Sequence, residues 1–300
     1  MRRYSYQDCL ETSYRVNWRI DDVLGAETFD FARPWLPPSL SAAGRISCLN
    51  EEEKRKLTHV EMGAYAHLFG FVEEFIAPQM TSLAQAQEQA DRGAFEALAN
   101  FVAEEVKHMH LFRRLRDRVD AQLGFRLRLL DGEQQVADYV LGKNTGAVLL
   151  LTSCIEWFTQ LHYLAAIREA AGLDPLTKKI FRAHWLEESQ HAKLDHLETL
   201  RAFATMGEGE RDRAVSDLIE LVGAVDGLLQ KQSGYDLENL SRYLGRDFKP
   251  AERDEIGREV LAVKRWVFIL SGVTHPNFNE LFLQVTTSHQ RERVALALAS

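Results

Sequence analysis

A chain of 300 residues with 46% hydrophobic and 27% charged residues has the composition of a folded globular protein, long enough for one large core or two ordinary domains. Its net charge of −8 gives no support to a nucleic-acid partner, because phosphate binding needs a basic face. Cys9, Cys48 and Cys154 share no short spacing, which argues against a disulfide framework, a structural zinc site and a cysteine-ligated iron–sulfur cluster.

Neither the N-terminal residues nor the apolar runs have the pattern of a targeting or membrane segment. The most apolar run, residues 147–151, stops at Thr152 and Ser153, far short of the roughly 20 residues that a membrane helix needs. The first residues are not followed by the apolar core of a signal peptide. We therefore expect no membrane span and a cytoplasmic location.

Residues 1–48 are predicted to form an N-terminal arm. Prolines interrupt any long helix there, while large aromatic residues supply apolar surface to bury. We expect an irregular segment with one short helix, packed on the rest of the chain. The prolines are Pro34, Pro37 and Pro38, and the aromatic residues are Trp18, Phe29, Phe31 and Trp35.

Four long helices are predicted after the arm. The first begins after Asn50, which matches a capping box with Glu53, and it is expected to weaken at Pro78. The second stops at Gly124, and the fourth begins after Asp174, an N-cap followed by a proline. The predicted spans are 51–79, 87–122, 145–171 and 175–206.

The order of these helices predicts the fold class. Strand patterns are weak, and a long connection containing Asp131 and Gly132 joins two helical hairpins. This is the connectivity of a ferritin-like four-helix bundle, whose crossover leaves the second and third helices parallel. We predict an all-α single domain, 1–300, with the bundle in 50–206 and additional C-terminal helices in 209–297. Breaks among the last helices are expected near Gly234, Gly245, Pro250 and residues 272–276.

A carboxylate–histidine pattern occurs twice in the bundle segment. A glutamate and a histidine three residues apart lie on one helix face and can reach the same metal pair. In a chain of this composition, about one Glu-x-x-His match is expected by chance. The register carries more weight, because in each half a lone glutamate precedes the motif's glutamate by 32 residues. The members are Glu73, Glu105 and His108 in the first half, and Glu156, Glu188 and His191 in the second.

Four carboxylates and at least two imidazoles on inward helix faces can bind two iron ions. Acidic residues on apolar stripes are costly unless they are paired or bind metal, which favours this interpretation over exposed helix glutamates. Glu74 adjoins Glu73 and stays an alternative first ligand, although the common spacing favours Glu73. His184 falls on the same face as Glu188 and would add a third imidazole. A surface or core histidine beside Trp185 is the equally weighted alternative.

Four segments carry the pattern: Val72–Ala77, Val102–His108, Cys154–Glu156 and His184–His191. Over about residues 50–206 the sequence resembles the p-aminobenzoate N-oxygenase family, a branch of the ferritin-like di-iron oxygenases. The hallmark of that family, a further histidine that gives His-x-x-x-Glu-x-x-His, is matched from His184 to His191. The ligand set that the resemblance implies is Glu73, Glu105, His108, Glu156, His184, Glu188 and His191.

The resemblance implies an enzyme with two iron ions, or manganese in their place, that oxidises a small organic substrate with dioxygen through a peroxo-diferric intermediate. N-oxygenation of an amine is the narrower expectation. Glu105 and Glu188 would bridge the irons as the catalytic carboxylates. The remaining ligands would cap one iron through Glu73 and His108, and the other through Glu156, His184 and His191.

The partners and the surroundings of this site are less defined by the sequence. No electron-transfer cofactor motif is visible, so we expect an external electron donor such as a separate reductase. The sequence is compatible with a homodimer. Aromatic residues near the ligands are either walls of a substrate cavity or plain core. They are Phe69, Phe112, Trp157, Phe158 and Tyr163.

Three other functions remain alternatives. A ribonucleotide-reductase-like radical subunit would need a tyrosine one turn after His108, where this chain has Phe112. A ferritin-like iron-binding or ferroxidase protein would use the same ligands, but it has less need for the C-terminal helices. A di-metal hydrolase would use a metal-bound water and no dioxygen.

Overall fold

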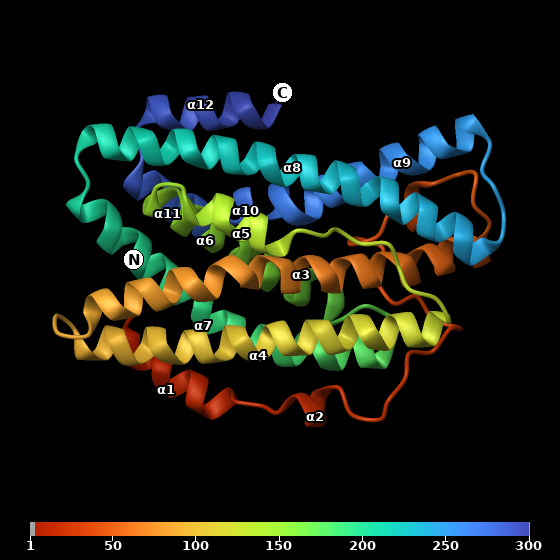
Figure 1. Cartoon of the computed structure of the whole chain (residues 1–300), viewed down its shortest axis with the longest axis horizontal. Coiled ribbons are helices and arrows are strands. Elements are labelled where there is room, and N and C mark those ends of the chain that lie inside the picture. The colour runs from red at the N-terminus through yellow and green to blue at the C-terminus, as the bar shows by residue number, and fades with distance from the viewer. Residues whose placement is uncertain (1–3, 300) are drawn as a thin grey trace.

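The computed structural model describes residues 4–299 and shows a helical protein without a strand in that range (Figure 1). Helices α3 and α4 lie side by side as one hairpin, and α6 and α7 form the second. The connection between the hairpins crosses the bundle and contains a short helix, α5. The predicted all-α, ferritin-like four-helix bundle is therefore confirmed. The bounds are α3 (Glu51–Gln87), α4 (Arg92–Leu123), α5 (Glu133–Leu141), α6 (Thr145–Leu161) and α7 (Pro175–Thr205).

Three helix ends lie where the capping residues predict them. The side chain of Asn50 accepts hydrogen bonds from the backbone N–H groups of Glu52 and Glu53, and the Glu53 carboxylate accepts one from the N–H of Asn50. Gly124 ends α4 with a φ of 75°, a left-handed conformation that glycine adopts without strain. Asp174 caps α7 in front of Pro175.

Two other predicted ends were wrong. Helix α3 does not stop near residue 79 but passes through Pro78 to Gln87. Met80 and Ala84, beyond the proline, are buried, and α3 packs along α4, so this packing outweighs the backbone hydrogen bond that proline removes. Helix α4 begins at Arg92 rather than at residue 87, because the Asp91 side chain caps the N–H of Ala94.

The second half of the chain also departs from the predicted breaks. The third bundle helix changes at residue 162 from α6 to a π-helical segment, η2 (His162–Ile167). Gly234 does not interrupt α8 (Glu208–Leu244), since its neighbours Ser233 and Leu237 are buried and keep the helix packed. Gly245, with a φ of 64°, ends α8 as predicted.

The N-terminal arm packs against one side of the bundle. Its helix α1 (Tyr6–Val16) contacts α4 and α7, followed by the short α2 (Ile20–Val23) and the 3₁₀ turn η1 (Ala43–Arg45). Residues 1–3 of the predicted arm lie outside the described residues.

The C-terminal helices cover the opposite side, where α8 runs along α3 and α6 (Figure 1). Gly272 in this part is so close to α6 that an added Cβ would lie 2.5 Å from the carbonyl oxygen of Cys154. None of the helices within residues 4–299 combines the length and apolarity needed to cross a membrane. That residues 1–300 form one domain stays a prediction. The last helices are α9 (Pro250–Arg265), η3 (Trp266–Leu270), α10 (Ser271–Val273), α11 (Pro276–Val285) and α12 (Ser288–Ala299).

Candidate metal centre

The seven residues predicted as metal ligands all lie in the interior of the bundle, and each is at most 3% exposed. The helices contribute them in the order that the two motifs predict. Helix α3 supplies Glu73, α4 supplies Glu105 and His108, α6 supplies Glu156, and α7 supplies His184, Glu188 and His191.

Glu188 lies at the centre of this cluster. Its Oε1 is 3.1 Å from Nδ1 of His108 and also contacts Nε2 of His184, while its Oε2 is 2.7 Å from Nδ1 of His191. Glu105 spans the same two helices, with Oε1 2.7 Å from Nδ1 of His191 and Oε2 4.0 Å from Nδ1 of His108. Both carboxylates therefore have one oxygen toward each motif histidine, which is the geometry that a bridging carboxylate needs.

Two overlapping groups have ligand atoms within 4.8 Å of one another, and each could hold a metal ion. His184 shares its group with Glu73 and His108, not with Glu156 and His191 as the sequence-based distribution has it. The reason is that His184 precedes His191 by seven residues, about 10 Å along the axis of α7. Glu156 belongs to neither group. The groups are Glu73, His108, His184 and Glu188, and Glu105, His108, Glu188 and His191.

Hydrogen bonding tests whether these residues fit metal ions. Several of their buried polar atoms have no hydrogen-bond partner, although burying such an atom unpaired costs about 1–3 kcal/mol. Four buried carboxylates balance the charge of two divalent cations, and the mixture of carboxylate and imidazole suits iron or manganese. The cluster therefore fits two metal ions. The atoms without any partner within hydrogen-bonding distance are Oε2 of Glu73, Oε2 of Glu105, Oε2 of Glu156 and Nδ1 of His184.

The charges in the cluster depend strongly on one another. Burial and the neighbouring Glu105 carboxylate raise the pKa of Glu73 well above its usual value. Burial also acts on Glu188, but His184, His191 and His108 around it outweigh this effect, and its pKa falls well below the usual value. Burial raises the pKa of Glu156, and the charge of Glu188 adds to this shift. Without metal, the negative charge of the buried carboxylates must therefore be balanced by protons or by other cations.

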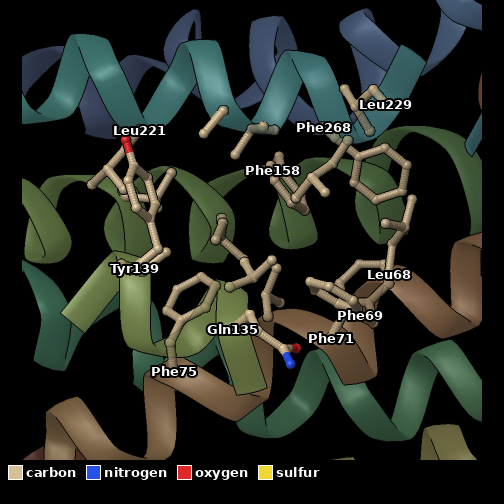
Figure 2. Close-up of a pocket in the computed structure, with 18 residues that line it drawn as sticks. Leu68, Phe69, Phe71, Phe75, Gln135, Tyr139, Phe158, Leu221, Leu229 and Phe268 are labelled. Atoms are coloured by element: carbon tan, nitrogen blue, oxygen red, sulfur yellow. The ribbon is translucent and has the colours of Figure 1, made fainter. Parts of the chain in front are cut away.

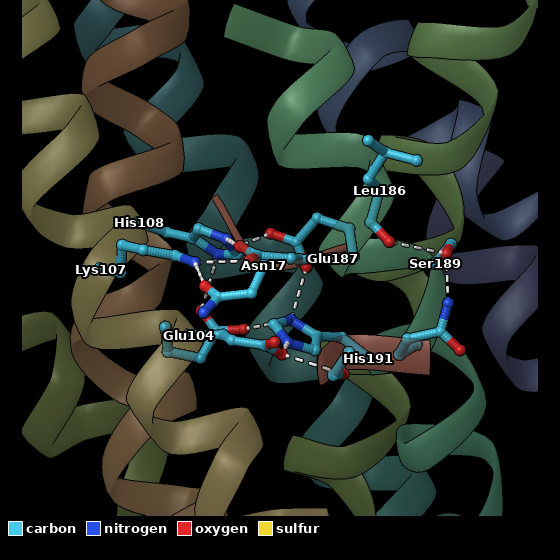
Figure 3. Close-up of polar contacts among 12 residues, drawn as sticks. Asn17, Glu104, Lys107, His108, Leu186, Glu187, Ser189 and His191 are labelled. Carbon is cyan, nitrogen blue, oxygen red and sulfur yellow. Dashed lines mark hydrogen bonds and ion pairs between the residues drawn. The ribbon is translucent and has the colours of Figure 1, made fainter. Parts of the chain in front are cut away.

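Two further glutamates hold the outer nitrogens of the motif histidines (Figure 3). Nε2 of His191 donates to Glu104 at 2.9 Å, and Nε2 of His108 donates to Glu187 at 2.9 Å. A carboxylate behind a ligand histidine fixes the tautomer that leaves Nδ1 free for a metal. The sequence placed Glu104 and Glu187 only beside the ligands, and the doubled Glu-Glu-x-x-His motif is the signal that could have found their role.

The N-terminal arm contacts both of these outer carboxylates. The hydroxyl of Ser13 in α1 donates to Glu104 at 3.4 Å. Lys107 pairs with Glu187, and its ammonium group also donates to the side chain of Asn17 (Figure 3). The same ammonium group lies 4.3 Å from the centre of the Trp18 ring. The arm is therefore connected to the cluster through one residue beyond each histidine.

The choice between Glu73 and Glu74 is clear in the structure. Glu73 is 2% exposed and lies in the cluster, with Oε1 3.8 Å from Nε2 of His184. Glu74 turns to the surface, where its Oε1 is 3.8 Å from the guanidinium of Arg113. Only Glu73 has the position of a ligand.

An apolar cavity of about 240 Å³ lies between α3, α5, α6, α8 and η3 (Figure 2). Of the aromatic residues proposed as walls, Phe69 and Phe158 line it. The other three do not: Phe112 stacks on Phe69, Trp157 stacks on His275, and Tyr163 stacks on Trp185. The ring centre of Phe69 is also 5.3 Å from that of His184, so one side chain joins the cavity to the cluster.

The helical bundle with its buried carboxylates and imidazoles defines a di-metal carboxylate protein. The family model described as P-aminobenzoate N-oxygenase AurF matches residues 11–240, and the chain belongs to this family. The match extends beyond residues 50–206 into α1 and α8. Family and cluster together indicate a di-metal oxidase or oxygenase.

Solved structures of the R2-like ligand-binding oxidase are similar to the chain at low identity. A mutant with an anaerobically reconstituted Mn/Fe cofactor has a TM-score of 0.47 at 14% identity, covering 94% of each chain. Another mutant with an aerobically reconstituted Fe/Fe cofactor has a TM-score of 0.46 at 14% identity and the same coverage. No curated protein matches the chain.

Proposed function

We propose that this protein is a non-haem di-iron oxygenase that uses dioxygen to oxidise a small organic substrate. The observation that carries the proposal is the pair of overlapping ligand groups, which lies beside an apolar cavity inside the bundle. A di-metal centre next to a water-poor space suits the oxidation of an organic molecule better than the passage of water or free iron.

The residues of the cluster take distinct roles in this proposal. Glu105 and Glu188 would hold both ions, since each has an oxygen toward His108 and another toward His191. Glu73 and His184 complete one ligand group. Glu156 is the remaining buried carboxylate and adds its charge from α6. Bound in the ferrous state, two iron ions would supply the electrons that reduce dioxygen.

Several narrower predictions from the sequence accompany the proposal. They are the N-oxygenation of an amine, the activation of dioxygen by the two iron ions, electron supply from a separate reductase, a homodimer and a cytoplasmic location. Manganese in place of one iron stays an alternative, which metal analysis of the purified protein would decide.

The decisive experiment loads the protein with ferrous iron without oxygen, counts the bound iron, and then admits oxygen. We expect two irons per chain, uptake of oxygen and an oxygen-dependent change in the visible spectrum. Metal binding without oxygen uptake would favour the hydrolase. Repeated oxidation of added iron with no organic product from a panel of amines would favour the ferroxidase.

A pair of matched variants assigns the result to the cluster. Glu105→Gln removes one bridging charge and is expected to lower the iron content and abolish oxygen uptake. Glu74→Gln changes a surface glutamate on α3 and is expected to leave both unchanged. Equal behaviour of the two variants would contradict the proposed site.

A further inference from the structure

We infer that the cavity beside the metal cluster selects an uncharged, largely hydrocarbon substrate and rejects anions of the p-aminobenzoate type. The inference rests on the proposed function for the reaction that follows binding. The binding preference itself depends only on the cavity.

The lining of the cavity contains no Asp, Glu, Lys, Arg or His among its 18 residues. Sixteen of them are apolar, and only Gln135 and Tyr139 carry a polar group in the side chain. An ionised carboxylate inside this lining would lose its hydration without gaining a cation or enough hydrogen-bond donors. A hydrocarbon group would gain from burial instead.

The two polar side chains lie at the solvent edge of the cavity. Gln135 and Tyr139 both belong to α5, the crossover helix, and both are exposed, Tyr139 by 45%. The wall on the bundle side comes from α3 and α6, where Val72 precedes Glu73 and Ile155 precedes Glu156. The part of the cavity nearest to the metal ligands is therefore hydrocarbon.

Phe69 places this hydrocarbon part against the cluster. Its ring lines the cavity and lies 5.3 Å from the ring of His184 and 6.1 Å from that of Phe158, measured between ring centres. A molecule held in the cavity would thus lie one aromatic side chain away from a proposed metal ligand. This proximity makes the cavity the site for a substrate rather than a remote packing defect.

The volume is sufficient for a ring with a short chain. The cavity of about 240 Å³ is larger than the dry, apolar cavity of about 150 Å³ that binds benzene in an engineered protein. An aromatic ring with a short alkyl substituent is a suitable size, and each added methylene should strengthen binding until the cavity is full.

Binding to the full-length protein can be measured calorimetrically, without iron or oxygen. The matched probes are 4-methylaniline and 4-aminobenzoate, which differ by a methyl group in place of a carboxylate, both at pH 7.5. We expect 4-aminobenzoate to bind at least tenfold more weakly. From 4-methylaniline to 4-butylaniline, affinity should rise roughly fourfold per methylene. Equal or tighter binding of 4-aminobenzoate would overturn the inference.

Variants locate the binding. Ala224→Phe fills the cavity from α8 and is expected to weaken binding of 4-butylaniline at least tenfold. Gly227→Phe lies on the same helix, outside the lining and with open space around its Cβ, and should bind like the wild type. If Ala224→Phe does not fold, Val225→Phe tests the same wall. Unchanged affinity in the folded cavity variants would contradict the assignment of the site.

The two proposals fail separately. If the protein binds the probes as expected but does not bind iron or take up oxygen, the oxygenase proposal is refuted and the cavity preference is not. Oxygen chemistry on an anionic arylamine, with no binding of 4-butylaniline, would refute the cavity preference alone.

Discussion

Glu104 on α4 and His191 on α7 form a hydrogen bond of 2.9 Å across the bundle. The reverse pair is also present, because Glu187 on α7 accepts a hydrogen bond from His108 on α4. Each Glu-Glu-x-x-His motif thus supplies the carboxylate that orients the imidazole of the other motif. The two halves of the site depend on each other for the tautomer of their histidines.

Glu104→Gln should weaken metal binding by roughly 10–100-fold, because an amide holds His191 in its tautomer less firmly than a carboxylate does. Competition with a chromophoric chelator measures the change. Glu74→Gln, on the surface of α3, is the matched control and should bind metal like the wild type. An unchanged affinity in Glu104→Gln would show that this hydrogen bond does not support the site.

Lys107→Met should lower the unfolding free energy of the metal-free protein by about 2 kcal/mol, because it leaves the fully buried Glu187 carboxylate with His108 as its remaining side-chain partner. The double variant Lys107→Met/Glu187→Gln removes the stranded charge as well and should recover part of the loss. Urea unfolding of the four members of this cycle measures the coupling. Additive losses would mean that the two side chains act independently.

Acid should destabilise the protein through His162. Burial lowers its pKa to about 3, while Tyr65 donates to its Nδ1 at 2.8 Å and Ser271 accepts from its Nε2 at 3.1 Å, so the folded ring is neutral. The unfolded ring, with a pKa near 6.5, takes up a proton first as pH falls. Its contribution to stability is therefore complete above about pH 6.5 and is lost progressively toward pH 3.

Between pH 7.5 and pH 5.5 this loss amounts to about 1.4 kcal/mol, measurable by urea unfolding at the two pH values. His162→Gln should reduce the pH dependence by that amount. His289→Gln replaces an exposed histidine and should keep the dependence of the wild type. The same pH dependence in all three proteins would rule out His162 as a source.

Gly272→Ala should destabilise the protein by about 2 kcal/mol, because its Cβ would lie 2.5 Å from the backbone oxygen of Cys154 and α10 would have to move away from α6. Gly257→Ala in α9 meets nothing within 4 Å and should be neutral or stabilise by up to about 1 kcal/mol. Thermal unfolding compares the two. Equal effects would show that the close contact is not needed.

Local signals in the sequence predicted much of the fold and the position of the ligands. Asn50, Gly124 and Asp174 mark helix ends through their own side chains or φ angles, which depend on few neighbours. Pro78 was misleading, because packing between α3 and α4 decides whether the helix continues. The π-helical segment η2 left no recognisable pattern.

The finer structure of the site needed distances between helices. Spacing along α7 places His184 and His191 on one face, but only the structure shows which carboxylate each one meets. Glu104 and Glu187 look like ordinary neighbours of a ligand, because the partner of each lies on another helix. The cavity joins α3, α5, α6, α8 and η3, which no local pattern relates.

Ser13 contacts Glu104 and Trp18 contacts Lys107, so we expect docking of the N-terminal arm to be coupled to metal binding. If metal binding orders His108 and His191, it should also order the carboxylates of Glu187 and Glu104 that the arm contacts. By thermodynamic linkage, a docked arm should then strengthen metal binding. Limited proteolysis should therefore cut residues 17–30 more slowly in the metal-loaded protein than in the metal-free protein. Shortening the arm should release metal faster even though it removes no ligand.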